Sequence, residues 1–335
     1  MGSPETINQL IAMVSGGWVS QMIHVAAELG LADSMASGEQ PLEQLAQGCG
    51  THAPSLFRLL RSLASVGVFA ETRPGHFGLT PLAELLRSDH PQSLRQFARL
   101  VGDEHYLSWA GLIDCVRTGE NGFRRRYDTD VFSWYEHHPE RAMVFNGAMG
   151  DLSRMEVLAF LDAYPGFAEI KHLVDVGGCR GQLLEAVLTA HPHIRGTVFD
   201  QPGVLEGLEP APQLADRLTL QAGDFFSGVP AGADTYLMKH IVHDWHDQAC
   251  LTILGHIRQA MAPQARLLIL EPVIPPGNAP FPGKLLDLNM LVMTEGGRER
   301  TAEEYAQLLA ARGFQLERIV PTAAAISVVE ARAAG

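Results

Sequence analysis

The first half of the chain carries apolar residues at helical spacing. Residues 6–29 place apolar side chains at intervals typical of an amphipathic helix. Shorter helices are predicted over 42–47, which is followed by glycines, and over 54–66, where one stripe is mostly leucine. Two strand-like runs, 68–71 and 77–80, flank a Pro-Gly turn and predict a hairpin. Helix, turn, helix and hairpin in this order are typical of a winged helix.

More helical pattern follows from about residue 82 to 161, interrupted by the Arg- and Asp-rich segment 119–130. The second half changes to short apolar runs that alternate with helical stretches, which predicts a parallel α/β sheet with right-handed crossovers. Only four residues separate the last two runs, too few for a crossover helix, so we expect that pair to be antiparallel. The predicted strands are 172–176, 196–199, 218–221, 235–238, 266–270, 314–320 and 325–330.

The change of pattern near Pro165 and Gly166 predicts two domains, a helical winged-helix domain over 1–164 and an α/β domain over 165–335. The fold class is therefore expected to be α/β.

Composition narrows the class of partner. The chain has 335 residues, of which 46% are hydrophobic and 19% charged, as in ordinary globular proteins. Its formal net charge of −13 is unfavourable for binding nucleic acid or anionic membranes. The four cysteines form no C-x-x-C pair, which favours a reducing cytoplasm over a disulfide framework. We expect neither a signal peptide nor a membrane-spanning segment.

The strongest chemical signal is the segment DVGGCRG at 175–181. A predicted strand ends in Asp175, and a glycine turn then opens a helix. The spacing Gly-Gly-x-x-Gly differs from the dinucleotide fingerprint G-x-G-x-x-G. An acid two residues before Gly177 suits a ligand that has an ammonium group and no pyrophosphate, and S-adenosylmethionine is such a ligand. The alternative is an ordinary tight turn between a strand and a helix.

Acidic residues also end the next two strands. Asp200 can accept hydrogen bonds from ribose hydroxyls, in NAD as well as in S-adenosylmethionine. Asp224, beside Phe225, suits the polar edge and the flat face of adenine. Each feature alone is more often a turn, but three acids at one edge of a sheet predict a nucleoside site.

Three histidines follow the fourth strand at a spacing of three residues: His240, His243 and His246. With Asp244 and Asp247 they allow a metal site, but no cysteine partner or recognisable ligand set supports one, and we expect no metal. Structural roles are expected for His240 and His246. A neutral His243 beside the cofactor would be a suitable base for a phenol proton.

Two later acids could hold this imidazole. Glu271 ends the fifth strand, and Glu299 lies in the segment GGRERT at 296–301. A carboxylate near an imidazole fixes its tautomer and stabilises its protonated form. For Glu299 the alternative is a charge at the start of a helix, just before a Thr301 cap.

These motifs resemble the small-molecule O-methyltransferases of the plant caffeate and flavonoid type and their bacterial natural-product relatives. The HDW element followed by GGRERT is the most specific part, and the resemblance covers nearly the whole chain. It implies a Rossmann-like class I methyltransferase sheet with an N-terminal winged-helix dimerisation domain. The matching segments are HVAAELGLAD at 24–33, LLRSLASVGVF at 59–69, FNGAM at 145–149, DVGGCRG at 175–181, FDQPGV at 199–204, GDFF at 223–226, LMKHIVHDWHD at 237–247, LEPV at 270–273 and GGRERT at 296–301.

The resemblance also implies roles for individual residues. The predicted catalytic residues are His243 as base, with Glu271, Glu299 and Asp244 beside it. The predicted cofactor-binding residues are Asp175, Gly177, Gly178, Asp200, Gln201, Asp224, Phe225, Lys239 and Trp245. A substrate pocket is expected between the carboxyl edge of the sheet and the helical domain, although plain core packing is the alternative for each wall residue. The candidate wall residues are Trp109, Phe145, Met149, Asn289, Met290 and Met293.

The chain departs from the plant pattern in two places, and the second, after FNGAM, argues against a phenylpropanoid acceptor. Cys179 and Arg180 replace a small pair in the glycine loop, and Gly150-Asp151-Leu152 stands where plant members often carry histidine. The sequence thus predicts a cytoplasmic homodimer that methylates a hydroxyl, expected to be phenolic, of a small aromatic or polyketide-like molecule.

Three alternatives stay open. One is an N- or C-methyltransferase, and another is a non-methylating decarboxylase or hydroxylase on the same fold. The third is a winged-helix DNA-binding regulator. The acidic chain argues against that third reading, because helix 54–66 carries only Arg58 and Arg61 as basic residues.

Overall fold

The computed structural model describes residues 3–334, which fall into two compact units. The first unit runs to Ala110 and includes Phe132–Leu152. The second consists of Gly111–Val131 and the chain from Ser153 onward. The units interleave along the sequence, and the functional division into 1–164 and 165–335 stays a prediction.

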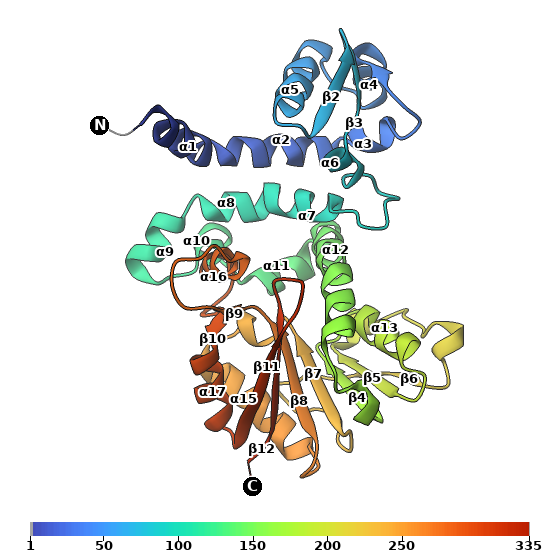
Figure 1. Ribbon diagram of the computed structural model, residues 1–335, viewed down its shortest axis with the longest axis vertical. Coiled ribbons are helices and arrows are strands. Elements are labelled where there is room, and N and C mark those ends of the chain that lie inside the picture. Colours follow the sequence, from blue (N-terminus) through green and yellow to red (C-terminus); the bar gives the residue numbers. More distant parts are fainter. Residues whose placement is uncertain (1–2, 335) are drawn as a thin grey trace. The chain divides into compact units, whose positions relative to one another are not determined.

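The first unit begins with the expected order of helices and hairpin (Figure 1). The chain bends by 43° between its first two helices at Ser15, whose hydroxyl donates to the carbonyl of Ile11, so the single helix predicted over 6–29 is two helices. Among the described residues no single helix is long and apolar enough to cross a membrane, and these two satisfy that length and composition test only as a bent pair. The elements are α1 (Pro4–Val14), α2 (Gly16–Glu28), α3 (Leu31–Ser34), β1 (Gln40–Pro41), α4 (Leu42–Gly48), α5 (Ala53–Ser65), β2 (Phe69–Arg73) and β3 (His76–Leu79).

The core of this unit is built by the apolar stripes that the pattern predicts. Leu60 and Leu63 of α5 are fully buried, with Phe69 and Phe77 of the hairpin. By contrast α1 buries none of its residues and exposes Leu10, Met13 and Val14. The helices that follow are α6 (Pro81–Glu84), α7 (Arg95–Leu100), the π-helical turn η1 (Val101–His105), α8 (Tyr106–Trp109), α11 (Val131–His137) and α12 (Pro139–Ala163), which continues into the second unit.

The second unit is built on a seven-stranded sheet of order β11-β12-β8-β7-β4-β5-β6. All neighbouring strands are parallel except at β12, which is antiparallel to both β11 and β8, as predicted for the last pair. The strands are β4 (His172–Val176), β5 (Arg195–Asp200), β6 (Leu218–Ala222), β7 (Thr235–Lys239), β8 (Arg266–Glu271), β11 (Phe314–Pro321) and β12 (Ser327–Ala333). Each predicted strand is present to within three residues of its expected bounds.

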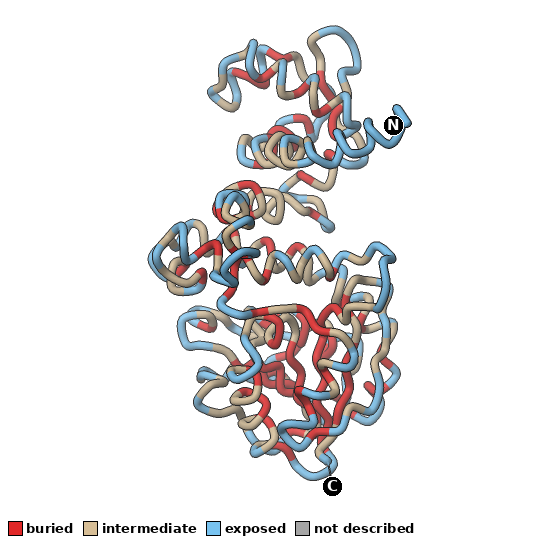
Figure 2. Tube along the Cα trace, turned by 90° about the vertical axis from the view of Figure 1, so that its left-hand side faces the viewer, coloured by how far each residue is buried: buried red, intermediate tan, exposed pale blue. Residues whose placement is uncertain are grey.

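The central strands are apolar on both sides because a separate hydrophobic cluster covers each face of the sheet. All six residues of β8 are buried. Buried segments accordingly concentrate in the strands of this sheet (Figure 2). The remaining elements of the unit are α9 (Leu112–Thr118), α10 (Gly122–Tyr127), α13 (Gln182–Ala190), α14 (Pro202–Leu205), α15 (Asp247–Ala260), α16 (Pro282–Met293), α17 (Ala302–Ala310), the 3₁₀ turns η2 (Phe167–Glu169), η3 (Pro212–Leu214) and η4 (Val242–Asp244), and the paired short strands β9 (Val273–Ile274) and β10 (Arg300–Thr301).

Candidate active site

The glycine turn after β4 packs closely against two other candidate segments. Gly177 has a φ of 74°, which favours glycine, and a Cβ there would lie 2.4 Å from Cδ1 of Ile241 and 3.7 Å from Cε1 of Phe225. A Cβ on Gly178 would lie 2.8 Å from the carboxylate of Asp175. The structure therefore brings the acid, both glycines and the aromatic residue together, as the sequence predicted.

Asp175 is a buried carboxylate on which the positive charge of Lys239 acts. Burial raises its pKa to about 7, Lys239 opposes this shift and Asp200 adds to it. A positively charged group bound beside Asp175 would offset that desolvation cost. The ammonium group of S-adenosylmethionine meets this need, so the residues present fit that cofactor.

The other predicted nucleoside contacts have local partners. The two carboxylate oxygens of Asp200 accept the backbone N–H groups of Cys179, at 2.8 Å, and Gln201, at 2.7 Å. Asp224 is exposed and accepts the N–H of the second residue after it, which closes its own turn.

The aromatic residues of this region form a cluster. The rings of Phe225 and Trp245 lie 6.3 Å apart at 78°, and Phe226 contacts the same indole edge-on at 4.7 Å. A flat ligand face would therefore meet a rigid aromatic surface here.

The segment after β7 is held at its backbone from both sides. One oxygen of Glu271 accepts the N–H groups of three successive residues, 241–243, at 2.7–3.2 Å, and the other accepts the hydroxyl of Tyr305. The fully buried guanidinium of Arg300 donates to the carbonyls of Val242 and Trp245.

The sequence analysis expected Glu271 to hold the imidazole ring directly. In the described part of the chain its hydrogen bonds go to the backbone of the segment and to Tyr305 instead. These contacts make Glu271 a support for the segment that carries His243.

His243 is buried among three carboxylates. Its Nδ1 lies 2.7 Å from Glu299 and its Nε2 lies 3.5 Å from Asp244. Burial alone would lower the pKa of the ring, but the charge of Asp244, the hydrogen bond and charge of Glu299, and the charge of Glu271 raise it to about 10. The ring is therefore protonated at neutral pH in this structure, whereas the sequence analysis expected a neutral imidazole.

The acids around the ring are perturbed as well. Burial raises the pKa of Asp244 to about 6, with His243 opposing it, and burial also raises the pKa of Glu299. The titrations of groups this close are coupled. At neutral pH the imidazole carries one proton, and the acids around it outnumber it.

Glu299 is not the helix-start charge that was the alternative for it. The capping box at the start of α17 is made by Thr301 and Glu304. Gly297 allows the preceding turn to approach the histidine, because a Cβ there would lie 2.5 Å from the carbonyl oxygen of His243. The adjacent Arg298 N–H donates to that carbonyl at 2.8 Å.

The two remaining histidines of the segment differ. His246 caps α15 and accepts the N–H of Ala249, the structural role expected for it. His240 has a φ of 54° and its Nε2 lies 2.9 Å from Glu156. The described residues contain no group of three potential ligands that could hold a metal ion.

The predicted substrate-wall residues fall in both units. Trp109, Phe145 and Met149 belong to the first unit, where the ring of Phe145 stacks on Tyr135 at 4.8 Å. Met290 and Met293 of α16 are buried within the second unit, and Asn289 is half-buried. Their common role as a pocket wall stays a prediction.

Sequence reasoning missed three supporting residues. Arg300 lies in GGRERT and Tyr305 lies just after it. A large charged or polar residue near the start of a predicted helix could have indicated a supporting role for each. Glu156 lies 84 residues before His240, and no local pattern marked it.

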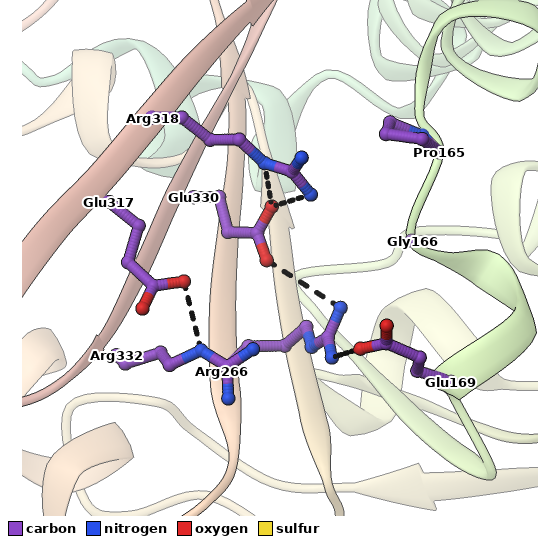
Figure 3. A pocket seen from close by; sticks show the side chains of 8 residues that line it. All are labelled: Pro165, Gly166, Glu169, Arg266, Glu317, Arg318, Glu330 and Arg332. Carbon is purple, nitrogen blue, oxygen red and sulfur yellow. Dashed lines mark hydrogen bonds and ion pairs between the residues drawn. The ribbon is translucent and has the colours of Figure 1, made fainter.

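A second group of charged residues lines a pocket at the opposite end of the strands (Figure 3). Arg266 begins β8 and pairs with Glu169 and Glu330, and Arg318 pairs with Glu330 as well. Arg332 pairs with a further glutamate, Glu317. Opposite charges are matched in this pocket, which distinguishes it from the surroundings of His243.

The sequence matches two protein families over different parts of the chain. Residues 109–315 match the O-methyltransferase domain, and residues 11–89 match the O-methyltransferase dimerisation domain. A phenazine O-methyltransferase of Lysobacter antibioticus is 46% identical over 96% of this chain and 95% of its own length. A phenazine-1-carboxylate N-methyltransferase of Pseudomonas aeruginosa is 35% identical over 93% of this chain and 92% of its own.

Solved structures agree. That of LaPhzM has a TM-score of 0.93 and 45% identity, covering 99% of this chain and 100% of the other. Human N-acetylserotonin methyltransferase in complex with S-adenosylmethionine has a TM-score of 0.91 at 28% identity, and each chain is fully covered. The glycine turn, the buried histidine and these similarities lead to one conclusion: the chain belongs to the O-methyltransferase family, whose members use S-adenosylmethionine.

Proposed function

We propose that this protein transfers the methyl group of S-adenosylmethionine to a hydroxyl of a small aromatic natural product, with His243 holding the proton of that hydroxyl. The observation that carries the proposal is the buried imidazole, bonded at Nδ1 to Glu299 and 3.5 Å from Asp244 at Nε2. A buried imidazole with a strongly shifted pKa and two carboxylate neighbours supports a role in proton transfer, because strongly shifted pKa values cluster at functional sites.

The cofactor-binding residues proposed are those at the edge of the sheet around the glycine turn. Asp175 would face the ammonium group and Asp200 the ribose, while Phe225 and Trp245 offer an apolar surface. The cofactor supplies an electrophilic methyl carbon on a positively charged sulfur. Gln201, Asp224 and Lys239 complete the proposed set.

The raised pKa of His243 suits a phenolic acceptor. A phenol has a pKa of about 10 in water, close to the value of about 10 for this imidazole. Because the ring is protonated at neutral pH, it must first release that proton to solvent. Transfer of the phenol proton to the resulting neutral ring is then nearly balanced in free energy and gives a nucleophilic oxyanion beside an imidazolium. Glu299 and Asp244 stabilise the imidazolium. Alignment of the oxyanion for attack can remove about 7–11 kcal/mol of barrier in favourable cases.

The relatives guide the choice of acceptor. The 46% identical relative is named for a phenazine, and a structural relative of the neocarzinostatin pathway was solved with a dihydroxynaphthoic acid. We therefore propose a fused-ring phenol as the acceptor, with 1-hydroxyphenazine as the first compound to assay. The candidate walls Trp109, Phe145, Met149, Asn289, Met290 and Met293 remain part of this proposal.

The match to the dimerisation domain supports a homodimer, and the exposed apolar residues of α1 offer a surface for it. A cytoplasmic location is proposed on the unpaired cysteines, all four of which are free thiols.

The test is incubation of the purified protein with S-adenosylmethionine labelled in its methyl group and with 1-hydroxyphenazine or 1,4-dihydroxy-2-naphthoate. The expected product carries one labelled methyl on oxygen, identified by mass and by NMR. N-methylation is the second candidate, because relatives that are 35% identical are named N-methyltransferases. Phenazine-1-carboxylate as acceptor separates the two, and label on nitrogen alone would reject O-methylation.

A further inference from the structure

The carboxylate of Glu156 makes contacts that neither the motifs nor the proposed mechanism explain. Glu156 lies on the last part of α12, and its side chain is 14% exposed. One of its oxygens lies 3.2 Å from Nζ of Lys239 and the other lies 2.9 Å from Nε2 of His240. A single buried carboxylate thus bridges two consecutive residues at the end of β7.

Lys239 connects this carboxylate with the cofactor-binding edge of the sheet. In the pairing of β4 with β7, Asp175 lies opposite Leu237. Side chains two residues apart on a strand share a face, so Lys239 lies on the face of β7 that adjoins Asp175. Its positive charge acts on that carboxylate.

His240 connects the same carboxylate with the proposed base. Its ring centroid lies 4.8 Å from that of His243, with the planes tilted by 34°. Among the described residues its Nδ1 is buried and has no hydrogen-bond partner, so the contact with Glu156 is the one bond that orients this ring. The backbone of His240 is in the left-handed region, at a φ of 54°, a strained conformation that is found at functional sites.

We propose, on the basis of the proposed methyl transfer, that Glu156 is a positioning residue that couples the cofactor end of the site to the base. It fixes Lys239 next to Asp175 through one oxygen and fixes the ring of His240 against His243 through the other. The sequence analysis assigned His240 a structural role, and the present inference adds that this role is to support the base.

Glu156→Gln tests the coupling with little change of shape. An amide has one accepting oxygen where a carboxylate has two, so one partner loses its bond and the other loses a charge-assisted one. We expect the Kd of S-adenosylhomocysteine, measured by calorimetry, to rise about 5- to 10-fold and kcat with 1-hydroxyphenazine to fall about 10-fold, as for a lost hydrogen bond to a charged group.

Two further variants separate the two ends. Lys239→Met should raise the Kd, and His240→Phe, which keeps an aromatic ring, should lower kcat with little effect on the Kd. In the double variant with Glu156→Gln, the effects of Lys239→Met should be non-additive in Kd and additive in kcat. Those of His240→Phe should be non-additive in kcat and additive in Kd. Glu206→Gln, at an exposed position, is the matched control and should change neither.

A readout without turnover keeps this inference distinct from the proposed function. The ¹⁵N chemical shifts of the His243 ring should move in Glu156→Gln and in His240→Phe, and not in Lys239→Met. Absence of methyl transfer in the wild-type protein, with these shifts and Kd changes present, would refute the proposed function alone. Unchanged Kd, kcat and ring shifts in a folded Glu156→Gln protein, or full additivity in both cycles, would overturn the coupling role.

Discussion

Strand β8 joins two groups of charge that behave in opposite ways. At its start, Arg266 meets Glu330 and Glu169, and each charge there faces one of opposite sign. At its end, Glu271 is one of three acids whose charges raise the pKa of His243. Balanced pairs hold elements together, whereas an excess of buried acid shifts pKa values and stores a proton. The comparison shows that charge imbalance, more than burial, distinguishes the candidate catalytic end of the sheet.

The largest effect is expected from removing the imidazole at the acidic end of the comparison, where β8 ends. His243→Ala should lower kcat about 10³-fold, or about 4 kcal/mol of barrier, because it removes the group that holds the acceptor proton. Calorimetry should show S-adenosylhomocysteine binding within about 3-fold of wild type, since the proposed cofactor contacts lie on other residues. Loss of cofactor binding together with activity would instead mean that His243 supports the fold.

The next largest effect is expected from removing an acid at the balanced end of the comparison, where β8 begins. Glu330→Ala leaves Arg266 and Arg318 without their shared buried partner and should lower the free energy of unfolding by about 3 kcal/mol. The measurement is urea denaturation followed by circular dichroism. The kcat of the folded fraction should stay near wild type, and a large fall in it would remove the distinction between the two ends.

Glu299→Gln sharpens the comparison at the acidic end. An amide keeps a hydrogen bond to His243 Nδ1 but removes a charge that stabilises the imidazolium, so kcat should fall roughly 10- to 100-fold. The pKa of the ring, followed by NMR, should fall below its wild-type value. A ring pKa that does not change would show that Asp244 and Glu271 alone set it.

The stored proton should also appear in the pH dependence of stability. The pKa of His243 is raised to about 10 in the folded state from about 6.5 when unfolded, so its stabilising effect is complete below pH 6.5 and is lost as pH rises toward 10. The free energy of unfolding should therefore fall between pH 7 and 9.5, by at most about 1.4 kcal/mol per pH unit from this group.

His243→Gln is the control for this titration. The carboxyl groups of Asp175 and Asp244, whose pKa values are raised to about 7 and about 6, are mostly ionised in the upper part of this pH range. The slope should accordingly become shallower in the variant, and equal slopes in both proteins would contradict the raised pKa.

The smallest effect is expected at the rim of the balanced group. Glu317 and Arg332 pair at 2.9 Å with side chains 39% and 33% exposed, where solvent screens the attraction. Glu317→Ala should cost about 0.5 kcal/mol or less in urea denaturation. A loss of unfolding free energy as large as that in Glu330→Ala would mean that solvent exposure does not determine how much these ion pairs contribute to stability.

The sequence predicted the strands of the sheet well because their apolar runs are short, buried on both faces and bounded by turns. It also predicted the residues at the strand ends, Asp175, Asp200 and His243, because parallel strands bring their carboxyl ends to one edge. The break at Ser15 was missed, since the apolar pattern runs through it unchanged.

Contacts between residues far apart in the sequence could not be predicted from the local pattern of residues. The contact of Glu271 with three backbone N–H groups depends on how a turn from another strand folds over it. The protonated state of His243 depends on summed charge from three segments, and periodicity carries no information about such sums. Glu156 comes from a helix far away in sequence, so only the folded chain reveals it as a partner of His240.

The backbone of the turn at 241–245 is fixed from outside by Glu271 and Arg300, which bind its N–H and carbonyl groups. The path of the turn, and with it the position of the imidazole, therefore depends on two residues outside it. Laboratory evolution aimed at new acceptors should leave Glu271 and Arg300 untouched and direct its changes to residues that do not bind this backbone.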